Sequence, residues 1–464
     1  MKKFIITSLA ILICVCGSAQ PKVEVRAVWL TTLYGLDWPH NLSPASQKAE
    51  LCEMLDAFKR LNINVVFFQT RLRGDVAYPS AIEPFNSVFT GREGGNPGYD
   101  PLAFVIDECH KRGMECHAWI VALKMGKRKN KLTTPWGGEN YLNPALPATK
   151  TYLSGIVREI VSQYNVDGVQ FDYLRYPEHV SKLFDAKLYA RSGRNLPLAD
   201  WRRSNITSIV DALYHEIKSI KPWIKVSTCP IGKYCDLDGH SSGYNARDVV
   251  FQDSQLWMSR GIQDMICPMM YFKGNDFYSY ALNWQSHNSG RSVVPGLGIY
   301  FMDSKETHDG IAWNVNEFSN QIKYIRSNKL AGECFFRAAY LKQNIQHIAT
   351  SLELNEYQYP ALPPPISWQD SVKPAVPKYF AIKYLKAGTQ LSWHGLTNNV
   401  KYNIYGSNSW PVDVDNAANI IALKITDNNY LYNKYMTLPF LRYFAVTAID
   451  IYGNESKPAQ IKIE

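Results

Sequence analysis

Two kinds of segment alternate along this chain from Val23 to about Leu352, and this alternation limits the possible folds more than any other feature of the sequence. Short apolar runs rich in β-branched residues are each followed by a longer segment with helical spacing. Repeated βα units of this kind pair into a parallel sheet. The 464 residues are 46% hydrophobic, which is ample for a large core and a second domain.

Counting the segments defines the fold class. The strands expected are Val25–Thr32, Asn64–Thr70, Glu115–Ala122, Gly168–Phe171, Lys225–Cys229, Met265–Tyr271, Val293–Ile299 and Glu333–Ala338. The helices expected are Ser46–Leu61, Pro101–Arg112, Pro147–Tyr164, Trp201–Ile220, Ala246–Arg260, Ser279–Ser289, Val315–Asn328 and one after Leu341. Eight strands in alternation with eight helices predict an α/β fold, the (β/α)8 TIM barrel, over residues 22–355. A doubly wound open sheet is the alternative, and it is less favoured because no Gly-x-Gly-x-x-Gly follows the first strand.

The sequence pattern changes after the predicted barrel. A Pro-rich stretch, Tyr359–Pro365, can be neither helix nor central strand, so residues 356–370 are expected to form a linker. Residues 371–464 then alternate at β spacing, which predicts a small β-sandwich. Leu391-Ser-Trp393 and the closing segment Tyr443–Ser456 resemble strands of a fibronectin type III module. Such a module commonly serves as a spacer or a docking surface for a protein or the cell wall.

The first nineteen residues have the layout of a secretory signal peptide. They comprise Lys2 and Lys3, an apolar run from Phe4 to Val15, and the small residues Gly17-Ser18-Ala19 as a cleavage site. A lipid anchor at Cys14 or Cys16 is less favoured, because Ile13 and Val15 are poor neighbours for a lipidated cysteine. No other apolar run is long enough to span a bilayer. The sequence therefore predicts an exported protein, periplasmic or secreted, without a membrane span.

The distribution of charge limits the kinds of partner that the protein can bind. The formal net charge of +9 becomes +7 once Lys2 and Lys3 leave with the signal, and the basic residues are dispersed except for the run Lys124–Lys131. That run can meet an anionic polymer, although a solvated loop is the more common outcome. Nucleic acid is not expected as a partner of an exported protein with no other basic stripe.

Seven scattered cysteines remain after the signal, without a Cys-x-x-Cys pair or a histidine cluster. We therefore expect buried free thiols, no zinc site and no cofactor, while a structural ion in a loop stays open. Cys229 with Cys235 is the one local pairing to test.

The segment Val166–Pro177, VDGVQFDYLRYP, carries the clearest chemistry. Its apolar half predicts a buried strand, and Asp172 falls at the end of that strand beside Tyr173 and Arg175. An acid, a guanidinium and phenols at the carboxyl end of a strand suit the reactive face of a sugar-hydrolysing barrel. The alternative is that Asp172 merely pairs with Arg175 in a turn.

Other polar residues follow other predicted strands. After the second strand come Gln69, Arg71 and Asp75, where sugar binding and a loop-fixing Arg71–Asp75 ion pair are equal alternatives. On the third strand, His117 and Trp119 share a face and either line the barrel mouth or fill the barrel.

Aromatic residues end the sixth and seventh strands at Tyr271 and Tyr300. Aromatic rings suit stacking on sugar faces, but they also fill cores. We expect these two tyrosines to contribute to substrate binding.

Glycoside hydrolysis needs two carboxyl groups across the scissile bond. Asp172 is the candidate for one. Asp75, Glu178, Asp236 and Asp303 lie in predicted upper loops and compete for the other role, with Asp75 and Asp303 slightly ahead. Glu333 opens its strand and so belongs at the wrong end of a barrel.

At these positions the chain resembles the glycosyl-hydrolase-like 10 family of exported bacterial proteins. The matching pieces are Glu24–Thr32, Gln69–Arg71 with Asp75–Ser80, Phe171–Pro177, and Trp257 with Gly261–Tyr271. The resemblance implies a glycosidase barrel, and relatives in that family cleave the glycan strands of peptidoglycan, including strands stripped of peptides. The acid of the family's fourth strand corresponds to Asp172. The loops after strands two, five and seven match least, so the second carboxyl does not carry over.

The sequence therefore predicts an exported glycoside hydrolase acting on a polysaccharide, with peptidoglycan as the favoured substrate. The same fold acting on dietary or environmental polysaccharide is one alternative. A carbohydrate-binding barrel without catalysis is another, which the unassigned second acid keeps open.

Overall fold

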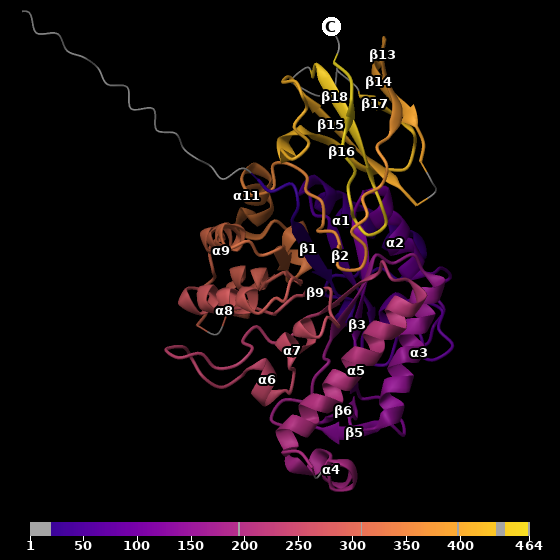
Figure 1. Ribbon diagram of the computed structural model, residues 1–464. Coiled ribbons are helices and arrows are strands. Elements are labelled where there is room, and N and C mark those ends of the chain that lie inside the picture. The colour runs from indigo at the N-terminus through magenta and orange to yellow at the C-terminus, as the bar shows by residue number, and fades with distance from the viewer. Residues whose placement is uncertain (1–19, 194, 308, 397–398, 433–440, 463–464) are drawn as a thin grey trace, which may run out of the picture.

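The structure is a computed structural model that describes residues 20–193, 195–307, 309–396, 399–432 and 441–462 (Figure 1). The predicted signal peptide, with Cys14 and Cys16, lies outside the described residues.

A closed parallel barrel forms the larger part of the molecule. Its strands are β1 (Val25–Leu30), β2 (Val65–Arg71), β3 (Glu115–Val121), β7 (Gly168–Asp172), β8 (Lys225–Thr228), β9 (Met265–Ile266), β10 (Ser292–Val293), β11 (Gly296–Leu297) and β12 (Gly332–Phe335). They pair in the order β10-β9-β8-β7-β3-β2-β1-β12-β11. Strands β10 and β11 are halves of one stretch, since β10 pairs with β9, β11 pairs with β12, and only Val294 and Pro295 separate them. The sheet therefore closes on itself as eight strands, which confirms the predicted (β/α)8 barrel.

Helices surround this sheet. They are α1 (Pro44–Arg60), α2 (Pro101–Lys111), α3 (Pro147–Gln163), α4 (Ala186–Ser192), α5 (Leu198–Ile220), α6 (Ala246–Val249), α7 (Ser254–Ser259), α8 (Asn275–Ser286), α9 (Val315–Ser327), α10 (Ala338–Lys342) and α11 (Ile348–Leu354). Short 3-10 turns are η1 (Leu33–Gly35), η2 (Ser87–Phe89), η3 (Lys182–Phe184), η4 (Ile299–Met302), η5 (Ser304–Glu306), η6 (Ile345–His347) and η7 (Ala417–Asn419). Proline opens α1, α2 and α3, where its fixed φ suits the first helical turn. No described helix has the length and apolar character needed to cross a membrane.

One predicted helix, Ala246–Arg260, is wrong as a continuous element. It breaks between α6 and α7, where Phe251 adopts a φ of 61°. The side chain of Gln252 explains the break, because its oxygen accepts from the Ile231 amide at 3.2 Å and its amide donates to the Leu174 carbonyl at 3.2 Å. These contacts tie the chain to two barrel loops at the point where the helix would continue.

Alternation along the strands produces two cores. On β1, Ala27 and Trp29 point into the barrel, whereas Val28 and Leu30 pack against the surrounding helices. The barrel interior is filled by Val25, Ala27, Trp29, Val65, Phe67, Trp119, Cys229, Met265, Cys267, Val294 and Cys334. The barrel is therefore a packed core and not a pore.

A small antiparallel sheet is inserted between β3 and α3. It consists of β4 (Lys124–Gly126), β5 (Thr133–Trp136) and β6 (Glu139–Leu142) in the order β4-β6-β5. Gly137 and Gly138, with φ of 57° and 77°, form the two-residue turn that joins β5 to β6. The basic run Lys124–Lys131 thus enters a folded hairpin unit and not only a solvated loop.

The C-terminal part forms two antiparallel sheets. One has the order β13 (Lys378–Leu385), β14 (Gly388–His394), β17 (Asn429–Tyr432), and the other β16 (Ile420–Ile425), β15 (Lys401–Ser407), β18 (Tyr443–Ile449), β19 (Ala459–Gln460). Leu391, Trp393, Ile404 and Phe444 belong to a shared buried core. These strands agree with the expected small all-β module, and its fibronectin type III character stays a prediction.

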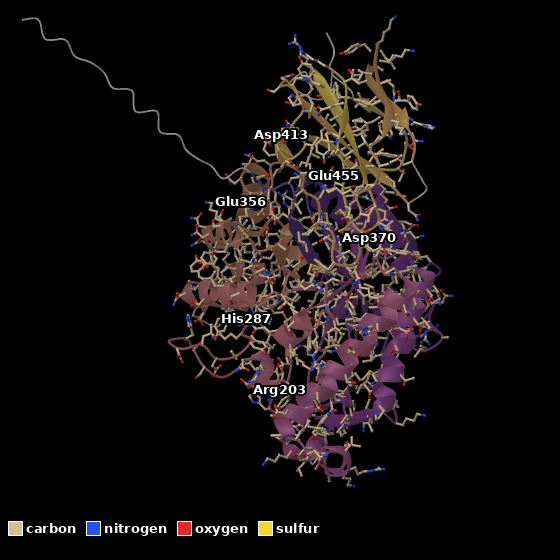
Figure 2. The ribbon with its side chains drawn as sticks, in the orientation of Figure 1. Arg203, His287, Glu356, Asp370, Asp413 and Glu455 are labelled. Carbon is tan, nitrogen blue, oxygen red and sulfur yellow. The ribbon has the colours of Figure 1, made fainter. Side chains whose placement is uncertain are left out.

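This C-terminal module covers the amino-terminal end of the barrel (Figure 1). Lys424 of β16 pairs with Glu115 of β3 at 3.1 Å, and Lys22 pairs with Glu455 at 2.6 Å. Figure 2 places Glu455 at this junction. The Trp368 indole also donates to Asp264 at 2.7 Å. The inserted β5 and β6 lie at the opposite end of the molecule, so the carboxyl ends of the barrel strands face away from the module.

Candidate active site

Asp172 is the last residue of β7 and lies where that strand leaves the sheet. Its side chain is buried, with the residue only 6% exposed. One carboxylate oxygen accepts from the Tyr173 amide at 2.7 Å and the other from the Trp119 indole at 3.3 Å. Burial raises the pKa of Asp172 above its usual value, and the Arg175 guanidinium opposes that effect. A carboxyl group of this kind holds its proton to a higher pH, which suits a general acid.

An aromatic wall adjoins the acid. The ring of Tyr271 lies 5.5 Å from that of Phe336 and 5.6 Å from that of Tyr300. Burial raises the pKa of the Tyr271 phenol, and Asp172 contributes to the same shift, so the two side chains are close enough to interact electrostatically. The two predicted tyrosines are therefore grouped near Asp172, on rings that suit the face of a sugar.

Arg175 and Tyr173 form a second group of side chains around Asp172. The guanidinium lies over the Tyr173 ring, 4.3 Å from its centroid, and Lys124 lies 5.1 Å from the same centroid. Arg175 is 4.0 Å from the carboxylate of Glu178, which accepts a hydrogen bond from the Tyr244 hydroxyl at 2.6 Å. The alternative of a simple Asp172–Arg175 turn pair does not account for this arrangement, because Asp172 accepts from Trp119 and from a backbone amide.

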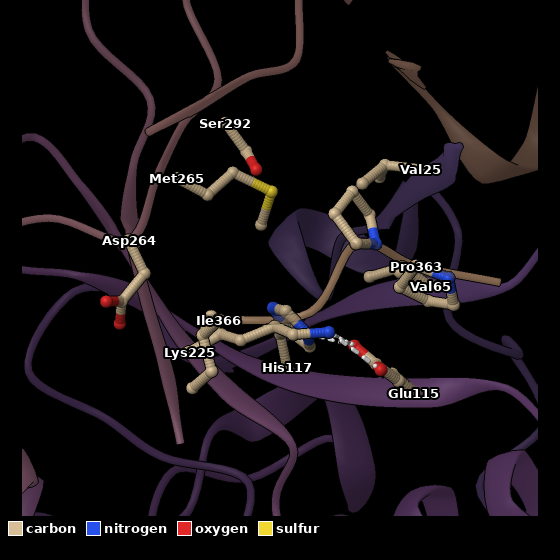
Figure 3. Close-up of a pocket in the computed structure, with 11 residues that line it drawn as sticks. Val25, Val65, Glu115, His117, Lys225, Asp264, Met265, Ser292, Pro363 and Ile366 are labelled. Carbon is tan, nitrogen blue, oxygen red and sulfur yellow. Dashed lines mark hydrogen bonds and ion pairs between the residues drawn. The ribbon is translucent and has the colours of Figure 1, made fainter. Parts of the chain in front are cut away.

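The structure places His117 away from this group. His117 faces the barrel interior as expected, but toward its amino-terminal end, where it bonds Glu115 at 3.1 Å beside Lys225 (Figure 3). It is fully buried and lies with Pro363 and Ile366 around a small cavity at the base. Of the pair His117 and Trp119, only Trp119 contacts Asp172.

Gln69 and Arg71 hold loops in place. The Gln69 side-chain oxygen accepts from the Thr31 hydroxyl at 2.7 Å and from the Thr32 amide at 2.9 Å. Arg71 is fully buried and pairs with Glu83 at 2.6 Å, so the Arg71–Asp75 ion pair considered from the sequence is absent from the described contacts. Both side chains stabilise the rim and do not extend from it.

Asp75 and Asp303, the two residues favoured from the sequence as the second catalytic carboxyl, also form contacts that fix loops. Asp75 accepts from Asn86 at 2.9 Å and pairs with Arg128 at 3.2 Å, which fixes the loop after β2. Asp303 caps the 3-10 turn η5 by accepting from the Lys305 amide at 3.0 Å. Neither has a contact with Asp172 or Arg175 among the described interactions.

Two residues near the site were not found from the sequence. Glu139, at the start of β6, pairs with Lys124 at 2.8 Å and lies 3.9 Å from Arg73. Burial alone would raise its pKa, but Lys124 and Arg73 lower it overall. Tyr244 comes from the loop after β8 and reaches Glu178. The Gly137-Gly138 pair between β-prone segments is the signal that could have revealed the hairpin carrying Glu139.

Seven cysteines lie within the part of the chain that the structure describes. All seven are free as expected, and Cys229 and Cys235 do not pair with each other. Five of them are buried, as predicted, whereas Cys52 and Cys235 are only partly buried. Burial raises the pKa of the Cys229 thiol well above its usual value, so it remains neutral next to Asp172. Within the described ranges, no three His, Cys, Asp or Glu side chains gather as metal ligands would.

Comparison with known proteins defines the class. The chain is 29% identical over 429 residues to "Glycosyl hydrolase YngK" of Bacillus subtilis (strain 168), covering 86% of this chain and 84% of the relative. It is 34% identical over 326 residues to "Glycosyl hydrolase DigH" of Escherichia coli (strain K12), covering 58% of this chain and 74% of the relative. The protein is a glycoside hydrolase, and a glycan is its class of substrate. Residues 24–301 match the family Glycosyl hydrolase-like 10, and the chain belongs to that family.

A solved structure supports the fold. The glycoside hydrolase domain of PgaB (BpsB) from Bordetella bronchiseptica matches with a TM-score of 0.53 and 14% identity, over 72% of this chain and 99% of that domain. At this identity the match is evidence for the barrel alone.

Proposed function

We propose that the protein is an exported enzyme that cleaves glycosidic bonds in the glycan strands of peptidoglycan, with Asp172 as one carboxyl of the catalytic pair. The observation that carries the proposal is the position of Asp172 at the carboxyl end of the fourth barrel strand, buried and beside an aromatic wall. The choice of peptidoglycan rests on the predicted export signal and the family resemblance.

In this proposal Asp172 is the general acid. Its carboxyl proton passes to the glycosidic oxygen as the bond to the anomeric carbon breaks. Trp119 and the Tyr173 amide stabilise the carboxylate that this transfer leaves behind, because both donate to it.

Glu178 is the best-supported partner. It lies against the same Arg175 guanidinium that acts on Asp172, and its side chain is 54% exposed, so substrate and water can reach it. It would attack the anomeric carbon directly or remove a proton from the water that attacks, and the carboxyl separation in a substrate complex decides which. Asp75 and Asp303 fit this role less well because their oxygens fix loops.

The test compares four single variants on peptide-free glycan strands, with release of reducing ends as the measurement. Asp172→Asn and Glu178→Gln are expected to lose about 10²- to 10⁴-fold in turnover, the usual contribution of a general acid or base. Asp75→Asn and Asp303→Asn serve as matched controls and are expected to retain most of the activity. Full activity in Asp172→Asn would contradict the proposal.

The same protein variants distinguish this proposal from its two alternatives, an environmental polysaccharide substrate and a non-catalytic barrel. Turnover of plant or host polysaccharides with no action on peptidoglycan strands would favour the environmental substrate. Binding of glycan by the parent and by Asp172→Asn, with no turnover by either, would indicate a non-catalytic barrel.

Export is tested at the amino terminus. Signal cleavage after Ala19 predicts that the mature protein begins at Gln20 when it is recovered from the periplasm or the medium. Incorporation of labelled fatty acid that depends on Cys14 or Cys16 would instead support a lipid anchor.

A further inference from the structure

A cleft of about 610 Å³, which we call the base cleft, lies between the amino-terminal end of the barrel and the C-terminal module. Its barrel wall includes Asn165 and Trp223, from the loops before β7 and β8. Its module wall includes Lys401 at the start of β15, with Thr426 and Asn428 from the loop between β16 and β17. The carboxyl ends of the barrel strands lie at the opposite end of the barrel, so the base cleft is separate from the candidate active site (Figure 1). Cavities of roughly 300–1,000 Å³ between domains are typical of ligand sites.

Direct contacts fix the two walls of the base cleft relative to each other. Lys424 of β16 pairs with Glu115 of β3 at 3.1 Å across its inner end. The Ile366 amide of the linker donates to the Tyr452 carbonyl of the module at 3.0 Å. A ligand would therefore enter a site that is already formed, which reduces the entropic cost of binding.

The carboxylates that line the base cleft already have partners. Glu115 accepts from Lys225 at 2.9 Å and from Lys424 at 3.1 Å. Asp167 bonds a histidine of α2 at 2.8 Å, and Asp450 accepts from amides of its own turn at 2.8 and 2.9 Å. These acids are satisfied by the protein itself, so the base cleft does not offer a set of free carboxylates to a cation.

The polar groups that remain available are mostly uncharged. Asn165, Thr426 and Asn428 are exposed, and their side chains form no hydrogen bond among the described residues. The half-buried Trp223 likewise has an indole N–H without a described acceptor, and Lys401 has no ion pair among the described residues. Amide and hydroxyl side chains both donate and accept, as sugar hydroxyls do, and an indole ring suits the face of a sugar. An apolar ligand would instead desolvate these groups without giving them partners.

We propose that the base cleft binds a short uncharged stretch of glycan, with one sugar ring on Trp223. Hydroxyl groups of the glycan then bond Asn165 on the barrel and Thr426 and Asn428 on the module. The inference goes beyond the proposed function, since it needs a glycan as ligand but no chemistry at Asp172. Occupancy of the base cleft keeps the polymer attached, which raises the effective concentration of glycan at the active site.

The first measurement is binding without turnover. The full mature chain carrying Asp172→Asn is titrated calorimetrically with short soluble oligomers of N-acetylglucosamine and of glucose. Addition of Trp223→Ala is expected to weaken binding at one site by about tenfold, the contribution of a well-placed aromatic ring. Addition of Thr426→Ala with Asn428→Ala is expected to weaken the same site severalfold, because two hydrogen bonds are lost.

The matched control is Trp410→Ala. Trp410 is 36% exposed and follows β15 at the end remote from Lys401, so its removal is expected to leave binding unchanged. Unfolding midpoints of all variants show whether a loss of binding reflects a loss of folding. The exposed positions of Thr426 and Asn428 keep the test decisive if Trp223→Ala does not fold.

The second measurement is turnover by the chain that retains Asp172. In Trp223→Ala, KM for long peptide-free strands is expected to rise severalfold with kcat unchanged, whereas both constants for short oligomers stay at the parent values. If the parent cleaves no glycan, the proposed function fails and the titration still decides the base cleft. If neither oligomer binds, or if the cleft variants bind as tightly as Asp172→Asn alone, the glycan site in the base cleft is refuted even where hydrolysis is observed.

Discussion

Glu333 provides a test of the electrostatics that close the barrel. It lies on β12, fully buried, opposite Arg26 of β1, and Tyr357 donates to one of its oxygens while the other has no partner among the described residues. Burial, with a contribution from the nearby charge of Glu24, raises the pKa of Glu333 to about 8. Glu333 is therefore protonated in the folded protein at neutral pH and ionised in the unfolded chain.

The sign of the effect follows from linkage. Because the folded state binds this proton more tightly, the contribution of Glu333 to the free energy of unfolding is complete below the unfolded pKa of about 4.5 and is lost as pH rises toward about 8. At about 1.4 kcal/mol per pKa unit, the loss across this window is on the order of 5 kcal/mol. The Glu333→Gln substitution removes the titrating carboxyl group and keeps the size and shape of the side chain.

The assay is urea unfolding followed by tryptophan fluorescence at intervals from pH 5 to pH 9. The stability of Glu333→Gln relative to the parent is expected to rise with pH by about 1.4 kcal/mol per unit and to level off above pH 8. Glu353→Gln, at an exposed position on α11, is the control and is expected to show a flat difference. A difference between parent and Glu333→Gln that does not change with pH would refute the protonated state of Glu333.

Three further outcomes follow from contacts described above. Trp119→Phe removes a donor to the Asp172 carboxylate, so the pKa of that acid should rise and the alkaline limb of the pH–rate profile should move to higher pH; an unmoved limb would exclude Asp172 as the acid that the profile reports. Glu83→Gln leaves the buried Arg71 charge without its partner and should lower the free energy of unfolding by about 3–5 kcal/mol in chemical denaturation. Trp368→Phe keeps the ring and deletes its hydrogen bond to the barrel base, which should cost about 1 kcal/mol and increase protease cleavage of the linker; unchanged cleavage would show that this bond does not hold the module.

The barrel could be predicted because its strands and helices differ in period and in length. Runs such as Val65–Arg71 are apolar and β-branched, and helices such as α1 open with proline and carry one buried face. The helix across residues 246–260 could not be placed correctly, because Gln252 breaks it through bonds to Ile231 and Leu174, which are distant in sequence.

The site was predictable only in part, because spacing gives the face of a strand and not the depth. His117 and Trp119 share the inward face, but two residues along a strand amount to roughly 6–7 Å, which separates the base of the barrel from its mouth. The partner of Arg71 is Glu83, on the far side of a long loop, and no local pattern indicates that choice. Asp172 was located because its strand and Pro177, which cannot continue a central strand, lie within one short segment, Val166–Pro177.

The placement of the C-terminal module fixes the direction in which the enzyme can work. The bonds of Lys424 and Trp368 hold the module against the end of the barrel remote from Asp172. A wall or protein surface that gripped the module would therefore hold the catalytic mouth pointing outward, a full barrel length away. If the proposed function holds, we expect a molecule anchored in this way to act on glycan that approaches from beyond it and not on the surface to which it is bound.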